Sequence, residues 1–222
     1  ARVLAEFPEE GNDTLIGLMM VEKALEKIFT EQEMMAWPRR KVLGIDVARY
    51  GADSTSIVAM DNFMQIGFRK HSGKDTMTTV GFAVAMFEEL GVEKSIDMIA
   101  VDDTGLGGGV TDRLIELGYN VLPVNFGSGA SEPEDYMNLK AEIYWFLRSL
   151  FKDGLISIMD EGKIVSQIPT IRYSYSSSAR LQIVSKDTMK REGFGSPDDA
   201  DALAIACWGV RHSGSYFPSP EK

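Results

Sequence analysis

The sequence is poor in the side chains that most often hold soft or borderline metals. Among 222 residues it has one cysteine, Cys207, and two histidines, His71 and His212. One cysteine excludes an intrachain disulfide, and these counts exclude a metal centre built on cysteine or on a histidine cluster. Cys207 lies in an apolar stretch, where a small buried side chain is expected. Any metal centre in the chain would have to use oxygen ligands.

Other absences limit the class of function. No apolar run approaches the length of a bilayer span, so no membrane partner is expected. No glycine-rich loop ends in Lys-Ser or Lys-Thr, so these residues are not a P-loop ATPase. Positive charge is scarce, since 23 Lys and Arg against 33 Asp and Glu give a net charge of −10. This balance argues against general affinity for nucleic acid, unless divalent cations neutralise a carboxylate site that touches the substrate.

An acid-rich stretch near the end of the chain opens a helix. Ser196 is a good N-cap, Pro197 suits the first helical position, and the residues after Asp201 are apolar nearly all round. Asp198 and Asp201 share one face of this helix, whereas Asp199 points elsewhere. The helix dipole alone favours acids in a first turn, and that ordinary interpretation stays open. Two like charges beside an apolar segment nevertheless need a compensating cation, which favours a functional site.

The apolar pattern predicts one α/β domain. Strands are predicted at residues 41–48, 54–61, 63–71, 96–101 and 120–124. Helices are predicted at 15–29, 76–90, 110–117 and 137–152, and a late hairpin at 168–175 and 181–185. Tight turns make the first three strands antiparallel, whereas the strand–helix–strand succession after them requires parallel pairing. The expected architecture is a mixed five-stranded sheet flanked by helices, with a separate β-hairpin.

Two more carboxylates lie on predicted strands. Asp46 falls within an apolar run, where a charged side chain needs a partner, either a basic residue or a bound cation. Asp102 ends the fourth strand, at the carboxyl edge where open α/β sheets bind ligands. The pair Asp102 and Asp103 before a glycine run also suits turn chemistry, so both interpretations stay open.

Three antiparallel strands followed by two parallel ones, with acids on strand one, strand four and a late helix, form the layout of the ribonuclease H fold. Residues 198–206 closely resemble the last helix of RuvC-type Holliday-junction resolvases. Over about residues 4–212 the chain resembles the nuclease domain of the large terminase subunit of tailed bacteriophages. The matching segments are 4–15, 44–48, 101–107, 138–142, 185–187 and 196–198.

This resemblance implies an endonuclease that cuts concatemeric double-stranded viral DNA during genome packaging, with little sequence preference, by a two-metal-ion mechanism. It implies catalytic metal ligands at Asp46, Asp102 and Asp201, with Asp198 as the fourth and Asp199 as a rival for that place. Oxygen ligands suit Mg²⁺ or Mn²⁺, two ions per active site.

The resemblance also implies an organisation and partners. Residues 1–40 would be a helical lead-in from an upstream ATPase motor in the same polypeptide, residues 41–212 the nuclease and 213–222 a flexible tail. The absence of an initiator methionine fits this expectation. The implied partners are double-stranded DNA, a small terminase subunit and a portal protein, in the host-cell cytoplasm during virus assembly.

DNA is expected to bind to basic residues near the predicted carboxylate site. They lie on the central helix, the late hairpin and the segment after it: Lys140, Arg172, Arg180, Lys186, Lys190 and Arg191. A solvated, solubilising face is the alternative interpretation of these charges.

Three other functions stay open. Residues 103–109 resemble the phosphate loops of actin-like ATPases and sugar kinases, which have no use for three acids opening the last helix. A RuvC-type Holliday-junction resolvase would carry the same acids, but the lead-in at residues 1–40 favours a piece of a larger motor. A non-catalytic ribonuclease H-like docking domain would not need the intact acid set.

Overall fold

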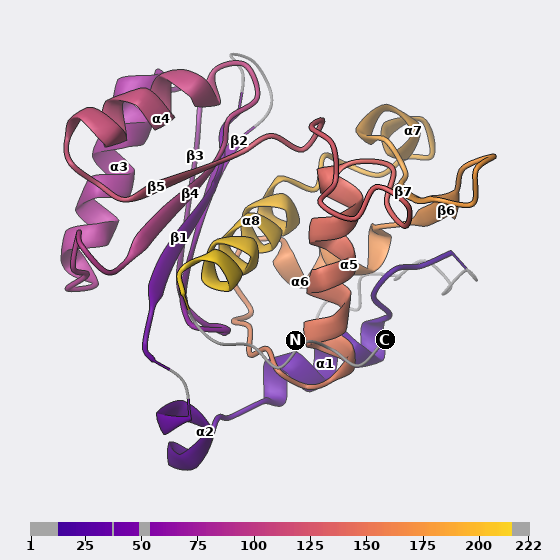
Figure 1. The fold of residues 1–222 in the computed structure, drawn as a ribbon, viewed down its shortest axis with the longest axis horizontal. Helices are drawn as coiled ribbons and strands as arrows, with labels where there is room; N and C mark the ends of the chain where they lie inside the picture. The colour runs from indigo at the N-terminus through magenta and orange to yellow at the C-terminus, as the bar shows by residue number, and fades with distance from the viewer. Residues whose placement is uncertain (1–12, 37, 49–53, 215–222) are drawn as a thin grey trace, which may run out of the picture.

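The computed structural model describes residues 13–36, 38–48 and 54–214. A mixed sheet separates two helical layers (Figure 1). Its order is β3–β2–β1–β4–β5, with β1 at Lys41–Asp46, β2 at Ser54–Asp61, β3 at Met64–Ser72, β4 at Met98–Asp102 and β5 at Val121–Val124. Strands β1, β2 and β3 pair antiparallel, whereas β4 joins β1, and β5 joins β4, in parallel. The predicted ribonuclease H-like sheet is confirmed.

Each face of the sheet is covered by its own helices. One face carries α3 (Thr76–Glu89) and α4 (Gly107–Glu116), and the other carries α5 (Leu139–Lys152) and α8 (Asp198–His212) (Figure 1). Along β1, Leu43 and Ile45 pack in the α3/α4 core, whereas Val42 packs in the α5/α8 core. Because side chains alternate along a strand, Asp46 lies on the same face as Val42. The same alternation on β4 places Asp102 on the α8 face.

Helix α8 lies directly on β1 because Gly44 has no side chain. A Cβ at Gly44 would be 2.3 Å from the Ala202 carbonyl oxygen and 2.4 Å from the Ala206 amide nitrogen. The helix is buried from Asp198 through Val210, which explains why its sequence is apolar nearly all round. This close approach fixes the first turn of α8 beside the end of β1.

Most of the remaining elements lie around the α5 side of the molecule, whereas α2 lies apart, below the lower end of β1 in this view (Figure 1). They are α1 (Leu18–Glu26), α2 (Glu31–Met35), α6 (Ile164–Gln167), the 3₁₀ helix η1 (Ile168–Thr170), the hairpin β6 (Tyr173–Tyr175) and β7 (Leu181–Ile183), and α7 (Lys186–Arg191). Helix α1 packs against α5 and adds Val21 and Ala24 to the core. No helix in the described ranges is long and apolar enough to cross a membrane.

Some predicted boundaries are wrong. The strand predicted at 168–175 begins only at Tyr173, because Pro169 lies in η1 and has no amide hydrogen for a sheet. The helix predicted at 15–29 ends earlier, since Lys27 is extended and Thr30 starts α2 with a capping box. Helix α7 was not expected, although Ser185 caps it by accepting from the Thr188 amide.

The predicted start of the last helix is also shifted. Pro197 takes the N-cap position in place of Ser196, and the helix begins at Asp198. The division into lead-in, nuclease domain and tail stays a prediction, because residues 1–12 and 215–222 lie outside the described residues.

Candidate active site

Two of the predicted acids end neighbouring parallel strands. The β1–β4 register runs to the pair Ile45 and Val101, and the next residue on each strand is Asp46 and Asp102. Asp102 Oδ1 accepts a hydrogen bond of 3.0 Å from the Thr104 amide, which turns the chain after β4. The two carboxylates therefore share the carboxyl edge of the sheet, where α/β folds place ligand sites.

The first turn of α8 is held by Gln167 of α6. Its Oε1 accepts from the amides of Asp199, at 3.0 Å, and Ala200, at 3.1 Å, and its Nε2 donates to the Ser196 carbonyl at 3.0 Å. The Ser196 hydroxyl donates to Asp198 Oδ1 instead of capping the helix. These bonds satisfy backbone donors that a helix start leaves open. Gln167 thereby orients the acidic turn, and no local sequence signal connects it to α8.

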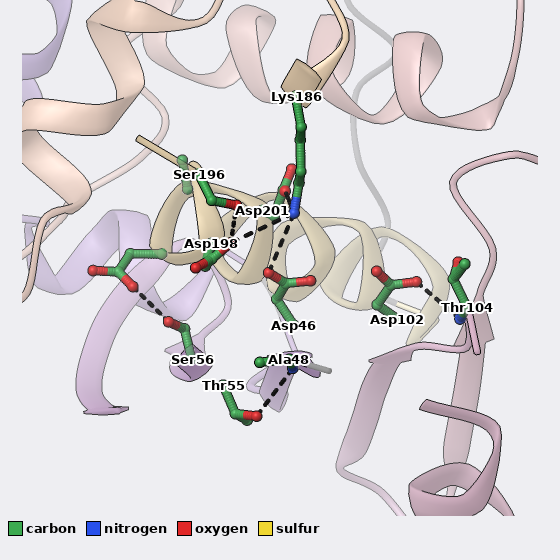
Figure 2. A network of polar contacts seen from close by, with 12 residues as sticks. Asp46, Ala48, Thr55, Ser56, Asp102, Thr104, Lys186, Ser196, Asp198 and Asp201 are labelled. Carbon is green, nitrogen blue, oxygen red and sulfur yellow. Dashed lines mark hydrogen bonds and ion pairs between the residues drawn. The ribbon is translucent and has the colours of Figure 1, made fainter. Parts of the chain in front are cut away.

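The Lys186 ammonium lies among three of the four acids (Figure 2). Its Nζ is 2.8 Å from Asp201 Oδ2, 3.5 Å from Asp198 Oδ1 and 3.7 Å from Asp46 Oδ2. Asp102 stands next to Asp46 in the same row of carboxylates (Figure 2). We call Asp46, Asp102, Asp198 and Asp201 the acid cluster. A lysine from α7 supplies the positive charge that this cluster requires.

The other oxygen of Asp201 is held from α5. Asp201 Oδ1 accepts a 2.7 Å hydrogen bond from the Tyr144 hydroxyl and lies 2.9 Å from the Lys140 ammonium. Both Asp201 and Tyr144 are fully buried. Tyr144 was not among the predicted site residues, because a tyrosine in an apolar helical stripe gives no sign of a carboxylate partner. Asp201 Oδ2 is thus the oxygen left facing the other acids.

The pKa values in the acid cluster diverge. Burial raises the pKa of Asp46 well above its usual value, Lys186 opposes this, and repulsion from Asp201 and Asp102 adds to it. Burial acts in the same direction on Asp201, but Lys140 and Lys186 outweigh it and lower its pKa to about 2. Burial favours the neutral amine of Lys186, yet Asp201 and Asp46 raise its pKa above the ordinary lysine value. The cluster strongly favours a cation at its centre.

Asp199 does not join the acid cluster. Its carboxylate is fully buried on the other side of α8, where it accepts from the Ser56 hydroxyl, from Lys70 Nζ at 2.6 Å and from the Lys163 amide at 2.8 Å. Its contacts are those of a structural group that ties α8 to β2, β3 and α6. Of the two rivals for the fourth acid, Asp198 is the one beside Lys186.

The oxygen donors suit a hard divalent cation once Lys186 has moved. In the described part of the chain, no group of three or more Asp, Glu, His or Cys side chains is arranged to hold a metal ion. Asp46, Asp198 and Asp201 converge instead on the Lys186 ammonium, which marks where positive charge belongs. An all-carboxylate donor set is the kind that Mg²⁺ and Mn²⁺ use. The residues present therefore fit such an ion.

Known structures share this fold, although no protein-family model and no curated protein matches the sequence. The nuclease domain of the large terminase subunit gp2 of bacterial virus Sf6 matches with a TM-score of 0.71 and 18% identity, over 87% of this chain and 98% of that one. The chain has the fold of a terminase nuclease domain. The large terminase nuclease of thermophilic phage G20c with bound magnesium matches with a TM-score of 0.65 and 16% identity, over 89% of this chain and 98% of that one. The large terminase nuclease domain of Thermus phage P74-26 matches with a TM-score of 0.56 and 16% identity, over 76% of this chain and 78% of that one.

Other structures of these terminase nucleases hold further divalent cations. The G20c nuclease is also known with cobalt, and a lysine-to-alanine mutant of the Sf6 domain with manganese or calcium. The resemblance expected from the motifs is confirmed in fold.

On this terminase nuclease fold, the six basic residues predicted to bind DNA differ in the contacts that they make. Lys140 and Lys186 contact the acid cluster. Arg172 lies 3.9 Å from Asp13 and 3.6 Å from Glu192, so its charge is already matched by acids.

The other three predicted basic residues lie farther along the late segment. Arg180, after the hairpin turn, donates from Nε to the Ser178 hydroxyl at 3.1 Å. Arg191, at the end of α7, donates to the Asp187 carbonyl at 3.3 Å, and Lys190 beside it is exposed. Their contact with DNA stays a prediction.

Proposed function

We propose that this chain is a divalent-metal-dependent endonuclease that hydrolyses phosphodiester bonds of double-stranded DNA during packaging of a viral genome. The observation that carries the proposal is the convergence of Asp46, Asp198 and Asp201 on one ammonium at the carboxyl edge of the sheet, with Asp102 beside them. The shared fold, and the divalent cations bound by terminase nucleases of that fold, support it.

The acid cluster would hold Mg²⁺ or Mn²⁺, two ions per site. Bound ions would supply an activated water and stabilise the leaving oxygen. Asp201 has a fixed orientation for this task, since Tyr144 and Lys140 hold Oδ1 and leave Oδ2 facing the site. Lys186, which lies among the same carboxylates, would supply positive charge near a bound phosphate.

Cleavage with little sequence preference follows from the kinds of residue at the site. Carboxylates act on phosphates through metal ions, and lysines contact phosphate oxygens directly. Contacts of this kind position the DNA backbone and carry no sequence information by themselves.

The proposed setting is a packaging machine in the host-cell cytoplasm during virus assembly. There the chain would act with an ATPase domain of the same polypeptide, a small terminase subunit and a portal protein. The presentation of DNA by such an assembly would compensate for the net charge of −10, which weakens association of the isolated chain with DNA.

Supercoiled plasmid incubated with the protein and Mn²⁺, Mg²⁺ or a chelator tests this function. Nicked and linear products with either metal, and none with chelator, are expected. A synthetic four-way junction and ATP serve as comparisons. Cutting of the junction alone would favour a resolvase, and thermal stabilisation by ATP without cleavage would favour an ATPase-like domain.

A further inference from the structure

A polar cavity of about 320 Å³ opens beside the acid cluster. It lies between β2, β3, α6 and the segment that precedes α8. Of the four clustered carboxylates, only Asp198 lines it. The cavity is therefore a separate space that shares one wall residue with the candidate active site. We call it the Lys163 pocket.

Two lysines line the Lys163 pocket, and one of them, Lys163, brings an unmatched positive charge. Lys70 of β3 is fixed by its 2.6 Å ion pair with buried Asp199, so its position is built into the core. Lys163, just before α6, anchors its backbone amide on the same carboxylate at 2.8 Å. Its side chain is exposed, and its ammonium forms no hydrogen bond or ion pair with any part of the chain that the structure describes. Lys163 is therefore available to a ligand.

The other walls of the Lys163 pocket also suit a nucleic-acid strand. Ser166 and Ser196 also line it, and their hydroxyls, which donate to the Lys163 carbonyl and to Asp198, can still accept a hydrogen bond from a sugar hydroxyl or a base amino group. Phe194 adds an aromatic side chain, which lies 5.4 Å from the Arg172 guanidinium, measured to the ring centre. Ammonium groups, hydroxyls and an aromatic ring together are the groups with which proteins hold the phosphate, sugar and base of one strand.

Size and charge limit what the pocket can take. Pockets for small ligands measure about 300–1,000 Å³, so this one admits a single nucleotide unit and not a duplex. Asp198 on the shared wall would repel a phosphate while it carries an uncompensated charge. Lys186, 3.5 Å from Asp198 Oδ1, offsets that repulsion without metal, and a divalent cation in its place would do the same.

We propose that the Lys163 pocket receives the backbone phosphate and sugar of a nucleotide next to the scissile phosphate of the DNA strand. The proposal rests on the proposed nuclease function. Because Asp198 belongs to both sites, a strand whose scissile phosphate lies at the acid cluster continues into the pocket. The pocket fixes the position and direction of the strand, so it contributes to DNA binding and not to the chemical step.

Charge reversal at Lys163, with a matched control, tests this role. Lys163→Glu is compared with Lys152→Glu as the control. Lys152 is also exposed and has no ion pair in the described ranges. It ends α5, about 18 Å along the helix from Lys140, so it lies away from the acid cluster. Affinity for a fluorescent 20-base-pair duplex is measured in Ca²⁺, and cleavage in Mg²⁺. Lys163→Glu should raise the Kd and KM roughly tenfold and lower the log–log salt slope by about 0.9, the value for one phosphate contact. Its kcat and melting temperature should match the parent.

The outcomes separate the pocket from the function on which it rests. A parent protein that neither binds nor cuts DNA with any metal overturns both proposals. A parent that cuts, with the two variants equal in Kd and KM, overturns the pocket alone. A free nucleotide is the other source of the same chemistry. If a deoxynucleoside 5′-monophosphate stabilises the parent but not Lys163→Glu, while both variants bind DNA alike, the strand assignment is wrong.

A tethering experiment places the strand. Cys207 is fully buried, so Lys163→Cys carries one accessible thiol. This thiol is joined by a disulfide to a DNA duplex that carries a thiol on one backbone phosphate. Addition of Mn²⁺ should then cut the duplex at one position within a few nucleotides of the tether. Lys152→Cys should give dispersed cuts. The same dispersed cuts from both tethers would overturn the proposal.

Discussion

The Lys186 ammonium lies 2.8 Å from Asp201 Oδ2, within the carboxylates proposed to bind divalent metal. The side chain of Lys186 is 36% exposed, whereas that of Asp201 is fully buried, so the lysine reaches into the cluster from the solvent side. The Lys186 ammonium and a bound metal ion would therefore compete for the same carboxylates. Occupation of this place by Lys186 would oppose metal binding until a cation displaces the lysine.

Removal of this lysine should strengthen metal binding. In Lys186→Ala the carboxylates lose their internal cation, so the metal-free protein should melt several degrees lower than the parent. Its Kd for Mn²⁺ by calorimetry should fall about tenfold, and saturating Mn²⁺ should raise its melting temperature more than it raises that of the parent. Lys152→Ala is the control and should leave both quantities unchanged. Weaker Mn²⁺ binding by Lys186→Ala would show that the lysine does not compete with metal.

Because the pKa of Asp46 is raised, the free energy of unfolding of the metal-free protein should fall as pH rises. As pH rises above about 3.9, the unfolded chain ionises Asp46 first, so the free energy of unfolding falls until pH reaches the raised folded pKa. Asp46→Asn removes this penalty, worth about 1.4 kcal/mol per unit of pKa shift. The variant should melt at the same temperature as the parent near pH 4 and higher at pH 7. A lower melting temperature than the parent at pH 7 would contradict this account.

Neighbouring Asp198 and Asp199 should behave differently when neutralised. Asp199→Asn leaves Lys70 without its buried partner, so we expect a loss of about 2 kcal/mol in stability and little change in the Kd for Mn²⁺. Asp198→Asn should keep or raise the melting temperature and weaken Mn²⁺ binding about tenfold. Thermal melts and Mn²⁺ calorimetry on both variants decide between them. The reverse pattern would make Asp199 the ligand.

The sheet and the acids could be predicted because local patterns determine them. Alternating apolar residues in β1 and β4 fix which face Asp46 takes, and a three-residue spacing puts Asp198 and Asp201 on one side of a helix. Their positions beside Lys186 agree with that reasoning. Local patterns carry this information because each concerns residues close in sequence.

The parts of the site that escaped prediction are neutral or depend on distant contacts. Gln167 is 32 residues from Asp199, and Tyr144 is 57 residues from Asp201. Nothing in their own segments indicates these partners. Lys186 was expected to contact DNA because of its charge, yet its ammonium lies within the acid cluster, since α7 brings it there.

Cleavage of supercoiled plasmid in Mn²⁺ by the parent, Asp46→Asn and Asp103→Asn tests the central claim most directly. Asp46 ends β1 and Asp103 directly follows β4, but only Asp46 belongs to the acid cluster. Asp46→Asn should lose at least about a hundredfold in cleavage rate while folding normally, and Asp103→Asn should stay within about threefold of the parent. Full activity in Asp46→Asn, or loss confined to Asp103→Asn, would contradict the assignment of the acid cluster as a metal-dependent nuclease site.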